Sequence, residues 1–139
     1  MGKNTVKEPW RNYVNEVINR FSSLLRLESV IVFGSWGRGG GGVWSDVDIL
    51  IITDDVKDIN ILNRFRLVSE YKVPNTDVFL YTYSELRRML KRGNPLAISA
   101  LAEGIPLIIS ARVRKLMELA RRCYVRRERV WMRVCEFIP

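Results

Sequence analysis

The chain has 139 residues, 47% of them apolar and 27% charged, with a formal net charge of +8. This length suits one globular domain, and neither a membrane-spanning apolar run nor a secretory leader is expected. The absence of His excludes a Ser-His-Asp triad and a His metal ligand within this chain. Any metal chemistry must therefore use carboxylates, which favour hard cations such as Mg²⁺.

Residues 8–109 alternate between helical and strand patterns. Apolar spacing predicts a first helix over residues 8–26, with Thr5 and Glu8 in capping-box positions. Continuous apolar runs predict strands, and periodic segments predict further helices. The predicted strands are 29–33, 46–52, 76–81 and 105–109, and the predicted helices are 60–71, 82–92 and 95–103. The alternation predicts one α/β (or α+β) domain, residues 1–139, with helices packed on a small sheet.

The last 30 residues form a basic segment. They hold nine Arg or Lys and three Glu, a net charge of +6. Helical periodicity predicts a basic C-terminal helix over residues 111–136, and the pattern extends to about residue 134. One side of this helix would carry most of the basic side chains: Arg112, Lys115, Arg122, Arg126, Arg129 and Arg133. Such a face can dock an acidic partner, bind nucleic acid or be solvated surface.

The only two cysteines, Cys123 and Cys135, fall in this basic segment. On one helix they would lie about 18 Å apart, which is too far for a disulfide. Two thiols are also too few for a zinc site, which needs four ligands. We therefore expect two reduced thiols in a cytoplasmic protein.

The residues that carry chemistry follow the strand 29–33. This strand leads into Gly34-Ser35 and a glycine-rich stretch, whose backbone N–H groups can approach a phosphate closely. Asp46 and Asp48 are two residues apart at the start of the next strand, so both carboxylates point to one face. Burying two like charges together is unfavourable unless a cation pairs them, and a divalent metal would do so.

A third carboxylate, Asp77, lies near the start of the strand 76–81. Taken singly, each feature has a simpler explanation, because glycine runs form flexible loops and aspartates cap turns or strand ends. A phosphate loop, paired carboxylates and a carboxylate on a further strand are more specific together than apart.

The motif resembles that of the minimal nucleotidyltransferases (MNT) of the DNA polymerase β superfamily. Their motif is Gly-Ser, ten residues, then Asp-x-Asp, which here is Gly34-Ser35, residues 36–45 and Asp46-Val47-Asp48. Arg38-Gly39, Ser45 and the segment around Asp77 also match, and the resemblance covers about residues 28–110. It implies a small mixed sheet backed by helices, the fold of the polymerase β palm.

The resemblance also implies the reaction, which is transfer of a nucleoside monophosphate from an NTP to a hydroxyl. It assigns catalysis and a two-metal Mg²⁺ site to Asp46, Asp48 and Asp77, and triphosphate binding to Gly34 and Ser35. Arg38 either contacts phosphate or is a solvated loop residue. In-line phosphoryl chemistry depends on positioning and charge neutralisation, and it needs no His.

Stand-alone domains of this kind often pair with HEPN proteins, all-helical ribonuclease toxins, and some act as antitoxins by transferring AMP to the toxin. The resemblance therefore implies ATP as donor, a protein hydroxyl as acceptor, and a homo- or hetero-oligomer. Two other hypotheses remain open. One is a non-catalytic partner-binding module with a vestigial nucleotide site. The other, less favoured, is a nucleic-acid-binding domain that uses the basic segment.

Overall fold

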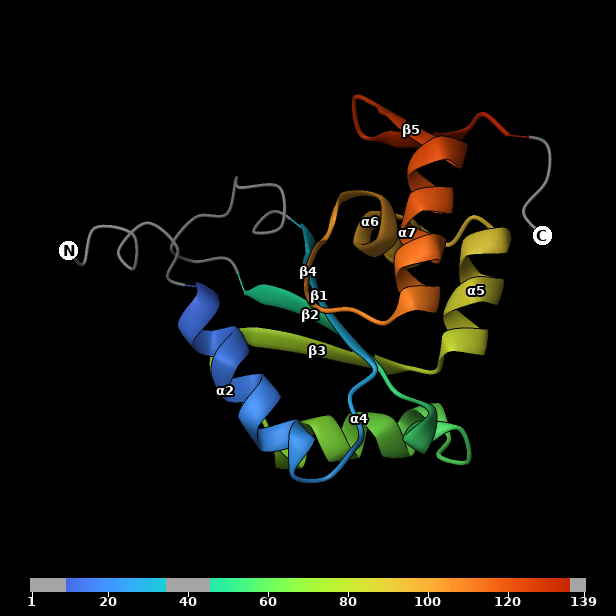
Figure 1. The fold of residues 1–139 in the computed structure, drawn as a ribbon. Coiled ribbons are helices and arrows are strands. Elements are labelled where there is room, and N and C mark those ends of the chain that lie inside the picture. The colour runs from blue at the N-terminus through green and yellow to red at the C-terminus, as the bar shows by residue number, and fades with distance from the viewer. Residues whose placement is uncertain (1–9, 35–45, 136–139) are drawn as a thin grey trace.

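The computed structural model describes residues 10–34 and 46–135, and a four-stranded sheet lies at its centre (Figure 1). Its strands are β1 (Ser29–Phe33), β2 (Val47–Ile52), β3 (Thr76–Tyr81) and β4 (Ile105–Ile108). Their order is β3-β2-β1-β4, so β3 and β4 are the edge strands. Because β1 is antiparallel to β2 and β4 while β2 is parallel to β3, the sheet is mixed. The predicted fold class is confirmed.

Helices cover both faces of the sheet (Figure 1). On one face lie α2 (Trp10–Ser22) and α4 (Ile61–Glu70), and on the other α5 (Tyr83–Lys91), α6 (Pro95–Glu103) and α7 (Ala111–Cys123). A short 3-10 helix, η1 (Asp54–Val56), follows β2. The β1 side chains alternate between two cores, since Val30 packs on the α2 side and Ile31 on the α7 side. Burial on both sides explains why β1 is a continuous apolar run.

Most predicted boundaries are confirmed to within a residue or two. The strands 29–33 and 76–81 and the helix 95–103 match, and Thr82 and Glu85 form the predicted capping box at α5. The first helix ends at Ser22 rather than at residue 26. Its predicted cap, Thr5 with Glu8, lies outside the described residues.

The predicted C-terminal helix over 111–136 is wrong beyond residue 123. The helix α7 ends at Cys123, and the chain turns into a hairpin of β5 (Tyr124–Arg127) and β6 (Val130–Arg133). The turn includes Glu128 at a φ of 57°. Valine and aromatic residues, which favour strands, are frequent in this stretch, and they prevail over the weak helical periodicity.

The prediction of two separated thiols is also wrong. Because the hairpin reverses the chain, Cys135 returns to the end of α7 and forms a disulfide with Cys123, with the Cα atoms 4.7 Å apart. The backbone N–H of Val134 also donates to the carbonyl of Cys123 at 2.7 Å. The estimate of about 18 Å assumed one continuous helix, and it fails with that helix.

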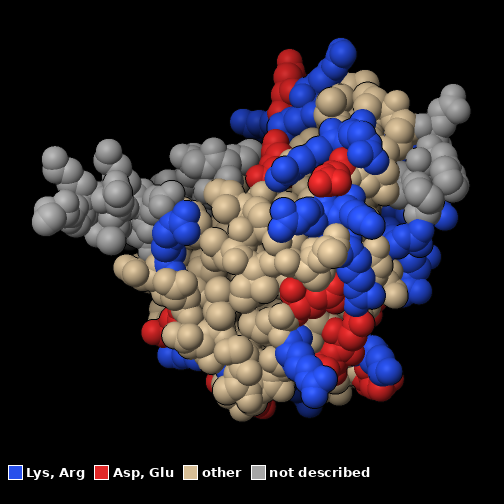
Figure 2. Space-filling model, in the orientation of Figure 1, with Lys and Arg blue, Asp and Glu red and all other residues tan. Residues whose placement is uncertain are grey.

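The predicted basic helical face does not form. Arg126, Arg129 and Arg133 lie on or beside the hairpin rather than on α7. Arg112 instead binds Glu28 and Asp54, with nitrogen–oxygen distances of 2.6 and 2.9 Å. Figure 2 shows basic side chains over α7 and the hairpin with acidic side chains among them.

We expect the disulfide to hold the hairpin in place, since a two-stranded hairpin alone is marginal in water. A Cys135→Ser variant should lose about 2–3 kcal/mol of stability, the amount typical for closing a short loop. Amide hydrogen exchange in residues 124–133 should accelerate while β1 and β2 stay protected. Wild-type protein treated with reductant should behave in the same way. Unchanged exchange in the hairpin would show that its packing, not the disulfide, holds it.

Across the described ranges, 10–34 and 46–135, no helix has the length and apolar character needed to span a bilayer.

Candidate active site

Four of the predicted site residues come together where β1 ends and where β2 and β3 begin. Gly34 directly follows β1, Asp46 directly precedes β2, and Asp48 and Asp77 are the second residues of β2 and β3. In the register, Phe33 lies opposite Asp48, and Asp48 lies opposite Asp77. The arrangement therefore runs across the sheet in the order β1, β2, β3.

The two strand carboxylates lie on the α5–α7 side of the sheet. Further along the same face of β2, Leu50 is buried in the core that includes α7, and on β3 Phe79 packs against that core. Because strand side chains alternate, Asp48 and Asp77 share that face. Asp48 is half-buried and Asp46 is exposed.

Asp48 is in an environment that opposes its negative charge. Burial raises the pKa of Asp48 to about 6, and the neighbouring carboxylates of Asp77 and Asp46 add to the increase. The three aspartates are thus close enough to act on one another electrostatically. Such a like-charge cluster is typical of sites that hold a cation, and perturbed pKa values cluster at functional sites.

Gly34 is required where it stands. Its φ is +76°, and a Cβ built on it would lie 2.5 Å from Oδ2 of Asp48. A side chain here would be strained by the backbone conformation and would also collide with the carboxylate. The glycine therefore lets the backbone after β1 pass directly beside Asp48.

Asp77 has a partner that the sequence did not suggest. The Nζ of Lys72 lies 3.6 Å from Oδ1 of Asp77, and it also donates a hydrogen bond to the carbonyl of Thr76. The side chains of Lys72 and Asp77 are each about half exposed. Lys72 lies outside the motif, and only the fold places it here.

The donor set fits Mg²⁺, because carboxylate oxygens are its usual protein ligands. Within the described residues, however, no group of three or more Asp, Glu, Cys or His side chains is already arranged to hold a metal ion. Substrate phosphates commonly complete such sites. The predicted phosphate-binding residues Ser35 and Arg38 lie outside the described residues.

Comparison with known proteins identifies the family. Residues 14–121 match the nucleotidyltransferase domain family. The chain belongs to this family. A chain from Sulfolobus solfataricus that is assigned as a nucleotidyltransferase is 31% identical, with 63% of this chain and 82% of that chain covered and a TM-score of 0.49. No curated protein matches.

Two further solved structures resemble this nucleotidyltransferase domain. One is tri-AMPylated Shewanella oneidensis HEPN toxin in complex with MNT antitoxin, at 16% identity and a TM-score of 0.50, with 78% of this chain and 80% of that chain covered. The other is a toxin-antitoxin with AMP-PNP, at 19% identity and a TM-score of 0.49, with 76% and 80% covered. At this low identity, the complex of the HEPN toxin with the MNT antitoxin shows only that the two chains share a fold.

Proposed function

We propose that this nucleotidyltransferase transfers AMP from ATP to a hydroxyl of a partner protein in a Mg²⁺-dependent reaction. One observation supports this proposal most: Gly34, directly after β1, lies beside Asp48 of β2, and Asp48 lies beside Asp77 of β3. Burial and the neighbouring carboxylates raise the pKa of Asp48, which means that its negative charge is disfavoured there. A site that disfavours its own negative charge is suited to a cation. Bound Mg²⁺ would neutralise carboxylate and phosphate charge together.

We assign the residues as follows. Asp46 and Asp48 hold the metal ions, and Gly34, Ser35 and Arg38 contact the triphosphate. The acceptor hydroxyl oxygen attacks the α-phosphorus in line, the bond from that phosphorus to the bridging oxygen breaks, and pyrophosphate leaves. By the resemblance, Asp77 would also hold metal and take the hydroxyl proton, and its place beside Asp48 in the register is consistent with that role.

The proposed partner is a HEPN-type protein. This rests on the resemblance of the motif and on the solved complex of a tri-AMPylated HEPN toxin with an MNT antitoxin. The reaction would take place in the cytoplasm, where ATP is supplied. Residues 1–139 would act as one domain, in which a motif core over 28–110 is followed by a C-terminal helix and hairpin. Nucleic-acid binding by the basic segment remains the less favoured alternative, because acidic side chains lie among its basic ones (Figure 2).

One observation favours the non-catalytic alternative. The ammonium group of Lys72 already pairs with Asp77, which would weaken a metal ligand. Incubation with α-labelled ATP, Mg²⁺ and the candidate partner separates the two functions. Transfer of label to the partner supports catalysis, whereas a stable complex without label supports the binding module.

We expect Mg²⁺ to bind weakly until nucleotide is present, because the described carboxylates do not form a ready cluster and Mg²⁺ gives up its waters reluctantly. Calorimetry with Mg²⁺ alone should show little heat at millimolar concentration. Addition of a non-hydrolysable ATP analogue should make binding saturable. Micromolar binding of Mg²⁺ alone would contradict this expectation.

A further inference from the structure

A groove between α4 and the edge strand β3 leads to the candidate active site. Two adjoining hollows form it, and they share Phe65 and Val68 of α4 and residues 78–79 of β3. The hollow nearer the site is also lined by Lys72 and Asp77. The groove therefore has a catalytic carboxylate of the proposed function at one end.

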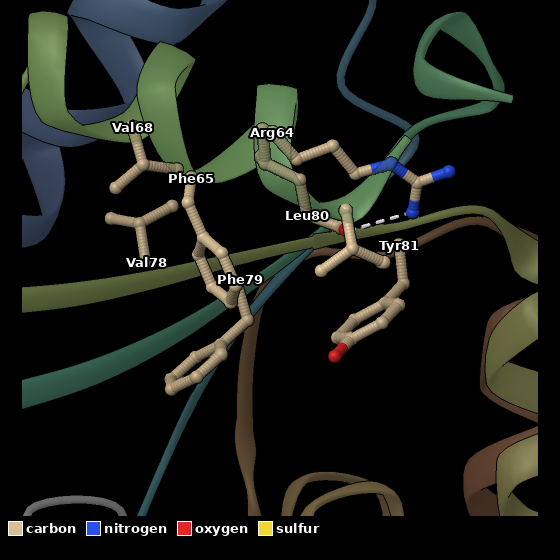
Figure 3. Close-up of a pocket in the computed structure, with 8 residues that line it drawn as sticks. Arg64, Phe65, Val68, Val78, Phe79, Leu80 and Tyr81 are labelled. Carbon is tan, nitrogen blue, oxygen red and sulfur yellow. Dashed lines mark hydrogen bonds between the residues drawn. The ribbon is translucent and has the colours of Figure 1, made fainter. Parts of the chain in front are cut away.

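The wall of the groove is apolar and exposed. The residues Phe65 and Ile61 are 56% and 47% exposed, which is unusual for large apolar side chains on one helix. Figure 3 shows Phe65 reaching down from α4 to the side of β3 that carries Phe79. The ring of Phe79 packs in turn on Phe33, with the ring centroids 5.9 Å apart. Apolar surface of this kind gains free energy when a ligand covers it.

The cation within the groove is already neutralised. Arg64 is buried, and its guanidinium donates to both carboxylate oxygens of Glu85. It also donates to the carbonyl of Leu80 (Figure 3). At the other end, Lys72 binds the carbonyl of Thr76. Because side chains satisfy these two carbonyls of β3, we expect a ligand to bind through its side chains rather than as an added strand.

The polar end of the groove matches a hydroxyl group. The carboxylate of Asp77 can accept a hydrogen bond, and the Nζ of Lys72, 3.6 Å from it, can donate one. A hydroxyl needs both a donor and an acceptor. In the strand order, Gly34 lies on the β1 side of Asp48 and this groove on the β3 side. A nucleotide and an acceptor would thus approach from opposite sides.

We propose that this groove binds the acceptor: an apolar segment of the partner protein that presents its hydroxyl side chain between Asp77 and Lys72. The inference rests on the proposed function and adds where the acceptor docks and what chemistry it has. The net charge of +8 further favours a segment without basic residues.

The first test measures binding alone, without nucleotide or metal. The probe is a short synthetic peptide with one tyrosine between leucines, titrated into the isotopically labelled protein and followed by NMR. Amide signals of Phe65, Val68 and residues 78–79 should shift and saturate at millimolar peptide. A peptide with serines in place of the leucines should bind at least fivefold more weakly. Absence of saturable shifts there, or shifts confined to the hairpin, would overturn the proposal.

The variant Phe65→Ser should weaken binding of the leucine peptide at least fivefold. Leu62→Ser is the matched control, because Leu62 is 62% exposed on the same helix and does not line the groove. The control should bind within twofold of wild type. Both changes are at exposed positions, and thermal melts should confirm that both variants fold. Equal binding by all three proteins would overturn the proposal.

A transfer assay separates this proposal from the proposed function. If the groove binds the acceptor, Phe65→Ser should raise the KM for the acceptor about tenfold and leave binding of the ATP analogue unchanged. Transfer with an unchanged KM would refute the groove and leave the function standing. Peptide binding that depends on Phe65, without transfer to any acceptor, would refute the function and leave the groove standing.

Discussion

Asp48→Asn should abolish nucleotide transfer while stabilising the metal-free domain. If Asp48 holds metal as proposed, its loss should remove several kcal/mol of transition-state stabilisation, about 10³-fold in rate, which would put transfer below detection. Stability should rise because the variant has no charge at a half-buried position beside Asp46 and Asp77. After allowance for solvent screening, we expect a gain of about 1–2 kcal/mol at pH 7.5 in the presence of chelator.

The stability gained by Asp48→Asn should increase as the pH rises. Burial raises the pKa of Asp48 to about 6 in the folded protein, from its ordinary value of 3.8. Between these values the folded state binds more protons than the unfolded state, so wild-type stability falls as the pH rises from about 4 to about 6. The advantage of Asp48→Asn should therefore be absent near pH 4 and complete above pH 7.

Denaturant unfolding at several pH values measures this effect. Asp58→Asn is a suitable control, since Asp58 is an exposed carboxylate in the turn after η1. The control should change neither transfer nor the pH profile. A loss of stability in Asp48→Asn at neutral pH would show that the carboxylate has a structural role.

Gly34→Ala should reduce transfer about 100-fold and destabilise the domain by about 1–3 kcal/mol. The added Cβ would lie 2.5 Å from the Asp48 carboxylate, at a φ of +76°, so that carboxylate must move. Displacement of a positioned catalytic group by about an ångström is enough for such a loss in rate.

Gly93→Ala separates backbone strain from contact with the site. Gly93 has a nearly identical φ of +77°, but the nearest atom to its added Cβ is Oη of Tyr124 at 4.0 Å. Gly93→Ala should lose less stability than Gly34→Ala, because it has the backbone strain without the collision, and it should keep wild-type transfer. If the two variants lost equal activity, the close approach of Gly34 to Asp48 would have no special role.

The sequence was informative where structure depends on local pattern. The strand 29–33 is buried throughout and holds four consecutive apolar residues. The helix 95–103 has Asn94 as its N-cap, begins at Pro95 and ends before Gly104. These elements can be predicted from local sequence because long-range contacts do not favour a different structure for the same residues. Four of the six predicted site residues lie in the described part, and the strand register brings them to one edge of the sheet.

The C-terminal hairpin could not be predicted in the same way. Its residues fit a weak helical pattern, and a long-range pairing of Cys123 with Cys135 accompanies the strand form. Lys72 and Phe65 were also missed, since their importance arises only from the packing of α4 and the following turn beside β3. Neither position belongs to a motif, so no local signal marked them.

Intact-mass spectrometry of the partner protein tests the central claim most directly. The HEPN-type partner is incubated with this chain, ATP and Mg²⁺, in parallel with the Asp48→Asn variant. We predict that the wild-type chain adds at least one AMP to the partner and that Asp48→Asn adds none. An unmodified partner that forms a stable complex with the wild-type chain in the presence of ATP and Mg²⁺ would contradict the claim.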